Sequence, residues 1–77
     1  MPDSTIARLR KSELEEIVIA VRTYEGNEFV DIRVFFGPRG QETKPTKKGV
    51  TVPLVLYREF HRTMDMLHDD MTKRGWA

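Results

Sequence analysis

The chain contains no cysteine in its 77 residues, so no disulfide can stabilise it, and nothing in it resembles a zinc-ligand cluster. A domain of this length buries only about 60% of the surface that its unfolded chain exposes, so a single core is marginal. Folds this small usually depend on a disulfide, a metal or self-association. With the first two excluded, we expect a homodimer.

Long hydrophobic runs are also missing. No stretch of about 18 apolar residues occurs, and the N-terminal region has no apolar core of a signal peptide. We therefore expect neither a membrane-spanning helix nor secretion.

The sequence carries no catalytic signature. It has no P-loop, no G-x-S-x-G and no cysteine nucleophile. His61, Asp65 and His68 share one face of the expected helix, but their spacing is not that of H-E-x-x-H, and no fourth ligand is evident. We interpret them as a solvated or interface face, and expect no enzyme activity, no metal site and no cofactor.

The formal net charge is only +1, which argues against a histone-like polycation. Charge is nevertheless concentrated in residues 33–52, where Glu42 is the sole acidic residue. The basic side chains there are Arg33, Arg39, Lys44, Lys47 and Lys48. This local basic patch is the feature of the sequence that indicates nucleic-acid binding.

Two segments alternate with the period of a strand, Glu16–Tyr24 and Phe29–Phe36. Glu25-Gly26-Asn27 between them supplies the residues of a tight turn. Pairing the two strands gives one aliphatic face and one polar, aromatic face. The polar face is predicted to hold Arg22, Tyr24, Asp31, Arg33 and Phe35.

Two shorter strands are expected around 41–44 and at 50–52, since Pro45 cannot donate to a strand ladder. Residues 1–14 show no clean period, so we predict a flexible arm whose basic residues could reach a phosphate backbone, followed by a DNA-binding domain over 15–77. From Pro53 to Arg74 the pattern predicts one long helix. The fold class is thus α+β, a four-stranded antiparallel sheet followed by one C-terminal helix (ββββα), as a dimer.

The helix has an apolar stripe at alternating spacings of three and four residues. We expect the helix to cover the aliphatic side of the sheet and to pair with the helix of a second copy. The stripe, which is the predicted dimer interface, comprises Tyr57, Phe60, Met64, Leu67 and Met71.

The polar face has two interpretations. Asp31 and Arg33 can form a surface ion pair of little energetic worth, with Tyr24 and Phe35 as ordinary strand residues. Alternatively, the rings stack on bases and the cations follow the phosphates of a single strand. The basic loop that follows this face favours binding.

Three segments of the chain occur in the order typical of a known family. They are VRTYEG (21–26), VDIR followed by aromatics (30–36) and KPTKKGVTV (44–52), and the expected helix follows them. In this order the chain resembles the single-stranded-DNA-binding domain of the transcriptional coactivator p15 family, also called positive cofactor four. The resemblance covers about residues 16–71. It implies homodimers whose paired sheets hold single strands or the two strands of an unwound duplex.

Carried over residue by residue, the resemblance assigns stacking to Tyr24 and Phe36, and phosphate contacts to basic side chains. These cations are Arg33, Lys44 and Lys48, with Lys47 as a further basic position and Arg22 on the same face. The turn residues Glu25, Asn27 and Glu28 depart from the basic turn of better-known members, and Phe36 stands where tryptophan is familiar. These departures predict weaker, more salt-sensitive binding.

We therefore expect a sequence-nonspecific single-stranded-DNA-binding protein, coactivator-like, acting on opened DNA in transcription, replication or repair, with the corresponding machinery as a partner. The chain lacks a long Ser- and Lys-rich arm and so looks like a compact prokaryotic or viral member. It would lie in the cytoplasm with the nucleoid, or in the nucleus if eukaryotic. The alternatives are a protein–protein interaction module and an RNA-binding protein that use the same face.

Overall fold

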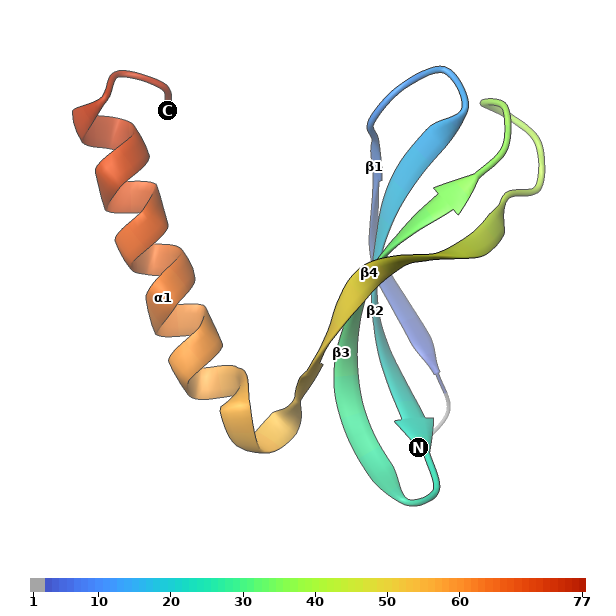
Figure 1. Cartoon of the computed structure of the whole chain (residues 1–77), viewed down its shortest axis with the longest axis horizontal. Coiled ribbons are helices and arrows are strands. Elements are labelled where there is room, and N and C mark those ends of the chain that lie inside the picture. The colour runs from blue at the N-terminus through green and yellow to red at the C-terminus, as the bar shows by residue number, and fades with distance from the viewer. Residues whose placement is uncertain (1–2) are drawn as a thin grey trace.

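The computed structural model describes residues 3–77. Four strands precede one helix: β1 (Ser4–Arg10), β2 (Glu15–Tyr24), β3 (Asn27–Phe36), β4 (Lys44–Pro53) and α1 (Leu54–Lys73). The strands form one antiparallel sheet in the order β1-β2-β3-β4, so each is joined to its neighbour in sequence (Figure 1). The predicted sheet and C-terminal helix are confirmed, although two strands differ from those expected.

The first difference concerns β1, which the sequence placed in a flexible arm. Residues 4–10 pair antiparallel with β2, with a register shift between Thr5 and Ala7 that leaves Ile6 as the extra residue of a bulge. Because the bulge interrupts the alternation of inward and outward side chains, the segment has no period of two. Met1 and Pro2, also assigned to the arm, lie outside the described residues.

The second difference concerns β4, where two short strands were expected and one continuous strand is found. Its register with β3 shifts between Arg33 and Phe35, which accommodates the extra residues of the lysine-rich segment. Gly49 lies opposite Arg33, where a Cβ atom would come within 2.6 Å of the Ile32 carbonyl oxygen. Glycine is therefore required at this close approach of two backbones.

The register of β2 with β3 runs without a shift from Glu15–Phe36 to Tyr24–Asn27. It confirms that the polar and aromatic residues of the two strands share one face. We call this the arginine face; it bears Arg8, Val18, Ala20, Arg22, Tyr24, Asp31, Arg33 and Phe35. Val18, Ala20, Asp31 and Phe35 are its buried members. Long arginine side chains cover the small residues beneath them.

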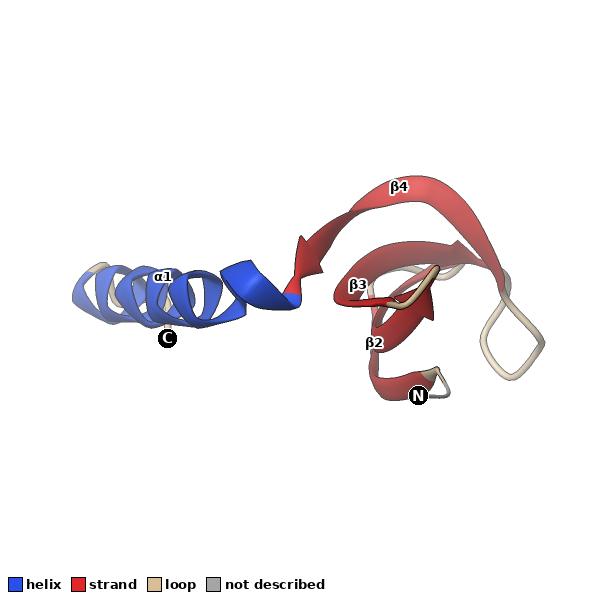
Figure 2. Ribbon diagram, turned by 90° about the horizontal axis from the view of Figure 1, so that it is seen from below, coloured by secondary structure: helices blue, strands red, loops and turns tan. Residues whose placement is uncertain are grey.

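The opposite face carries Ile17, Ile19, Val30, Ile32 and Val34, and we call it the aliphatic face. The expectation that α1 covers it is wrong. The helix lies beside the sheet, contacts only β3 and β4 among the strands, and buries none of its own residues (Figures 1 and 2). Since α1 begins at the residue after β4 ends, no loop is present to turn it back over the sheet.

Candidate nucleic-acid interface

A buried carboxylate organises the centre of the arginine face. Asp31 is only 4% exposed. It accepts hydrogen bonds from Arg22 Nε at 2.9 Å and from Arg33 Nε at 3.2 Å, and Arg33 Nη2 lies 3.1 Å from Oδ1. One carboxylate therefore orients two guanidinium groups. A second carboxylate also meets Arg22, because Asp3 Oδ2 lies 3.5 Å from its Nη1.

Burial opposes ionisation of Asp31, but the hydrogen bonds from Arg33 and Arg22 outweigh it and hold the pKa of the carboxyl below its ordinary value. The carboxylate is thus ionised at neutral pH, as the ion-pair interpretation of the sequence required. Asp31 is buried and binds two arginines, whereas the sequence had suggested only a surface ion pair between Asp31 and Arg33.

Arg33 also fixes the lysine-rich segment to the sheet. Its Nη1 donates to the Thr46 carbonyl oxygen at 2.9 Å, and the Thr46 hydroxyl donates to the Val34 carbonyl oxygen at 2.7 Å. The Lys48 backbone N–H in turn donates to the Thr46 hydroxyl at 3.2 Å. The start of β4 is therefore held in place beside the arginine face.

Three lysine side chains project from this segment. Lys44, Lys47 and Lys48 are all exposed. Lys48 Nζ lies 4.0 Å from Glu15 Oε2, a long contact for a side chain that is 74% exposed. Lys44 and Lys47 form no ion pair with any residue in the range 3–77. These cations are free to meet an anionic ligand.

The two predicted stacking rings lie far apart. Tyr24 is 68% exposed and pairs with Asn27 at one end of the β2–β3 hairpin, whereas Phe36, 53% exposed, pairs with Glu15 at the other. At about 3.3 Å per residue, the length of the hairpin separates them by roughly 30 Å. Alternation along β3 also puts Phe36 on the aliphatic side. The arginine face thus places Tyr24 next to Arg22, whereas Arg33 pairs with Val18 farther along the hairpin and Phe36 lies on the other face.

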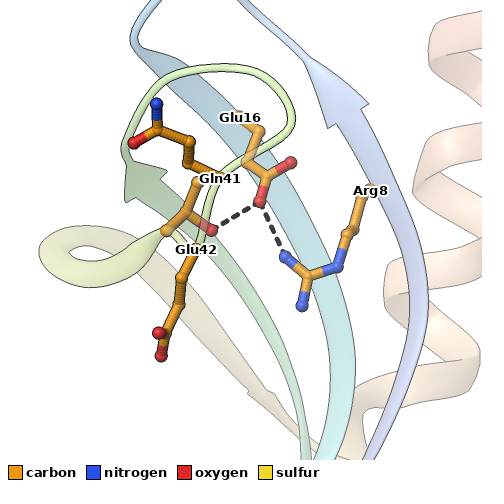
Figure 3. A pocket seen from close by; sticks show the side chains of 5 residues that line it. Arg8, Glu16, Gln41 and Glu42 are labelled. Atoms are coloured by element: carbon orange, nitrogen blue, oxygen red, sulfur yellow. Dashed lines mark hydrogen bonds and ion pairs between the residues drawn. The ribbon is translucent and has the colours of Figure 1, made fainter.

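A second polar network lies at the Phe35 end of the arginine face, and the sequence analysis missed it. Glu16 Oε1 accepts from Arg8 Nη1 and from the Thr43 hydroxyl, each at 2.7 Å (Figure 3). The hydrogen bond from Thr43, reinforced by Arg8, lowers the pKa of Glu16 against the opposing effect of burial. The Arg8 guanidinium lies 5.8 Å from the centre of the Phe35 ring, which it covers. Phe35 is therefore not available for stacking.

Little in the amino-acid sequence indicated this network between Arg8, Glu16 and Thr43. Arg8 and Arg10 were visible as basic residues near the N-terminus, but their partner depends on the pairing of β1 with β2. Arg10 reaches across two turns, where its Nη2 donates to the carbonyl oxygens of Glu13 and Gly37 at 2.6 Å. The alternation in β2 alone could not have placed Glu16 between these arginines.

The helix keeps its apolar stripe open. Tyr57, Met64 and Leu67 are 42%, 39% and 49% exposed, and Phe60 and Met71 are half-buried. Where α1 leaves the sheet, an apolar cavity of about 290 Å³ lies against the aliphatic residues of β2 and β3. Its lining includes Ile6, Ile19, Val21, Val30, Leu54 and Tyr57. Within residues 3–77, this apolar surface is thus left without a partner.

The helical His/Asp group has no special geometry. His61 Nδ1 lies 3.7 Å from Asp65 Oδ2, and both side chains are well exposed. Among residues 3–77, no three His, Cys, Asp or Glu side chains are grouped closely enough to hold a metal ion. Within the same range, no helix is long and apolar enough to cross a membrane.

The fold is similar to that of BPSL1147, a PC4 homolog from Burkholderia pseudomallei K96243. Its orthorhombic crystal form matches with a TM-score of 0.74 and 27% sequence identity over 87% of this chain and 90% of that one. The tetragonal form gives a TM-score of 0.73 at the same identity, over 86% and 97%. No curated protein matches the chain.

The sequence profile of Transcriptional Coactivator p15 (PC4) matches residues 11–62, which include β2, β3, β4 and the first half of α1. This range holds both arginines of the Asp31 cluster and the lysines Lys44, Lys47 and Lys48. The family is one of DNA-binding proteins without enzymatic activity. The resemblance found in the sequence is confirmed: the chain belongs to the transcriptional coactivator p15 (PC4) family.

Proposed function

We propose that the protein binds single-stranded DNA, or the separated strands of an opened duplex, with little dependence on sequence. The observation that carries this proposal is the pair of oriented guanidinium groups on the arginine face, together with the exposed lysines at the start of β4. Arg22 and Arg33 are oriented by Asp31, while Lys44 and Lys47 have no acidic partner in the described chain. Such a surface follows phosphates and releases their counterions.

Stacking would add to this electrostatic attraction. Tyr24 is well exposed beside Arg22 at the hairpin end. A base stacked on an aromatic side chain contributes about 1–3 kcal/mol, whichever base it is. Phe36 would stack at the other end of the hairpin if the strand leaves the arginine face over the edge of the sheet. Paired bases offer no free face to such rings, so single strands are favoured over duplex.

We also propose that the working unit is a homodimer. The stripe on α1 and the aliphatic face are both uncovered in the single chain, although a domain this small has little apolar surface to spare. A second copy would bury both surfaces. The protein would then act wherever DNA is open, in transcription, replication or repair.

A titration tests the proposed function. A fluorescent dT oligonucleotide of about 20 nucleotides should bind with an affinity that falls steeply as salt rises, and a duplex of equal length should bind clearly more weakly. A ribo-oligonucleotide of the same length shows whether the 2′-hydroxyl matters. Equal affinity for single strand and duplex would contradict the proposal. No binding at all would favour a protein–protein module, for which the open apolar stripe is the available surface.

A further inference from the structure

A polar pocket lies at the Phe35 end of the arginine face, beyond the cations already described. Its volume is about 360 Å³, and it is bordered by Arg8, Glu16, Gln41, Glu42 and Thr43 (Figure 3). β1 and β2 form one wall, and the segment that leads into β4 forms the other. A bound strand that follows the arginine face from Arg33 toward Phe35 would meet this pocket next.

The walls of the pocket are fixed to each other. Thr43 donates across the pocket to Glu16, and Glu16 also holds Arg8. Behind it, the Gly37 N–H donates to the Leu14 carbonyl oxygen at 2.8 Å, while Arg10 donates to the Gly37 carbonyl oxygen at 2.6 Å. The segment before β4 is therefore fastened to the β1–β2 turn, and the pocket needs little ordering when a ligand binds.

Several polar groups of the pocket have no partner among residues 3–77. Arg8 donates to Glu16 through Nη1 only, so Nε and Nη2 remain available. The carboxylate of Glu42 and the side-chain amide of Gln41 make no hydrogen bond to another residue of the described chain, and both residues are exposed. The pocket thus offers donors on one side and acceptors on the other.

The charge of the pocket argues against a phosphate. It contains one cationic side chain, Arg8, and two acidic ones, Glu16 and Glu42. A neutral group that both donates and accepts hydrogen bonds fits better, and the edge of an unpaired nucleobase is such a group. The phosphates of the same strand would remain over the arginines and lysines.

We propose that this pocket binds one unpaired base of the bound strand and favours guanine. This proposal rests on the proposed function. Guanine offers O6 and N7 as acceptors, the commonest specific target of an arginine. Its N1–H and 2-amino group are two parallel donors that a carboxylate can accept together. Arg8 and Glu42 supply these complementary groups. Thymine has no amino group, and its two carbonyl oxygens would face the carboxylate of Glu42.

The experiment compares four 20-nucleotide probes: dT20 and the same oligonucleotide with one central thymine replaced by guanine, adenine or cytosine. Fluorescence anisotropy with the full chain should show the guanine probe binding about fivefold or more tighter than dT20, the lower end of what one bidentate base contact provides. Glu42→Ala should abolish that preference. Glu59→Ala, which removes the same charge from the exposed surface of α1, should leave it unchanged.

The outcomes are distinguishable. If all four probes bind equally, the base pocket is refuted while single-strand binding stands. A guanine preference that survives in Glu42→Ala also refutes the pocket. If dT20 and its derivatives all fail to bind, the proposed function fails, and the base pocket fails with it.

Discussion

At the scale of single residues, the arginine face depends on carboxylates that hold its cations. Asp31 is the clearest example, because two guanidinium groups converge on it in a buried position. An isolated Arg33 would be free to turn away from the face. The acidic residue thus contributes to a cationic surface by fixing where its charges lie.

Asp31→Asn should destabilise the fold by about 1–3 kcal/mol, since it replaces one acceptor oxygen with an N–H donor and removes the negative charge shared by two partly buried guanidinium groups. The measurement is the urea midpoint of unfolding at neutral pH. Asp69→Asn on the exposed surface of α1 is the control and should change the midpoint little. Equal midpoints for the two variants would show that the Asp31 cluster contributes nothing.

The pH dependence of stability follows from the same residue. The pKa of Asp31 is lower in the folded chain than its ordinary value of 3.8, so its ionised form is favoured by folding. That contribution is fully present above the ordinary pKa and is lost as the pH falls below it toward the folded-state pKa. Unfolding midpoints between pH 6 and pH 2.5 should therefore drop more steeply for the natural chain than for Asp31→Asn. Parallel curves would contradict this assignment.

Glu16 should weaken the attraction of the surface for DNA, because it neutralises Arg8 and lies 4.0 Å from Arg10. Glu16→Gln should tighten binding to dT20 at low salt and steepen the plot of log affinity against log salt by about 0.7, the value for one additional phosphate contact on a single strand. Glu59→Gln on the exposed surface of α1 changes the net charge equally and should leave the slope unchanged. An unaltered slope in both variants would mean that Arg8, even when it is released from the charge of Glu16, does not reach a phosphate.

At the scale of elements, the lysine-rich start of β4 should provide the phosphate contacts that do not depend on sequence. Replacing Lys44 and Lys48 together by alanine should weaken binding to every oligonucleotide alike and flatten the salt plot by about 1.4. Arg62 and Lys73, two exposed cations of α1, give the matched control pair. A loss confined to one base composition would contradict this role.

Some of the strands and the helix could be predicted from the sequence, and others could not. The β2–β3 hairpin and its shared face follow from strict alternation around Gly26, and α1 follows from its apolar stripe. β1 was missed because one bulged residue, Ile6, breaks the period of two. β4 was divided at Pro45 because proline cannot donate to a ladder, but Pro45 lies on an edge strand, where that restriction is weaker.

The candidate site was predictable to the extent that it follows from alternation. Arg22, Asp31 and Arg33 could be placed on one face from their positions alone. The contact of Arg8 with Glu16, and the pocket beside it, depends on which strand lies next to β2 and on how the segment before β4 folds back. Neither follows from local pattern.

At the scale of the whole molecule, the arrangement of α1 makes the strongest case for self-association. The sheet and helix lie side by side and leave both the aliphatic face and the stripe open (Figure 2). In water, this much uncovered apolar surface favours association. A single chain would have to fold α1 back over the sheet, but the absence of a loop between β4 and α1 prevents that.

Light scattering at micromolar concentration should therefore give twice the chain mass of 9.0 kDa. Met64→Asp with Leu67→Asp places two charges in the stripe and should reduce the measured mass to that of one chain, with a lower thermal midpoint. Met66→Asp is the control, because Met66 is 65% exposed on the other side of the helix. This variant should remain dimeric. Because association stabilises only the folded form, the midpoint of the natural chain should also rise with protein concentration. A single-chain mass, with a midpoint independent of concentration, would overturn the helix-pairing proposal and require that the open stripe meets a different protein.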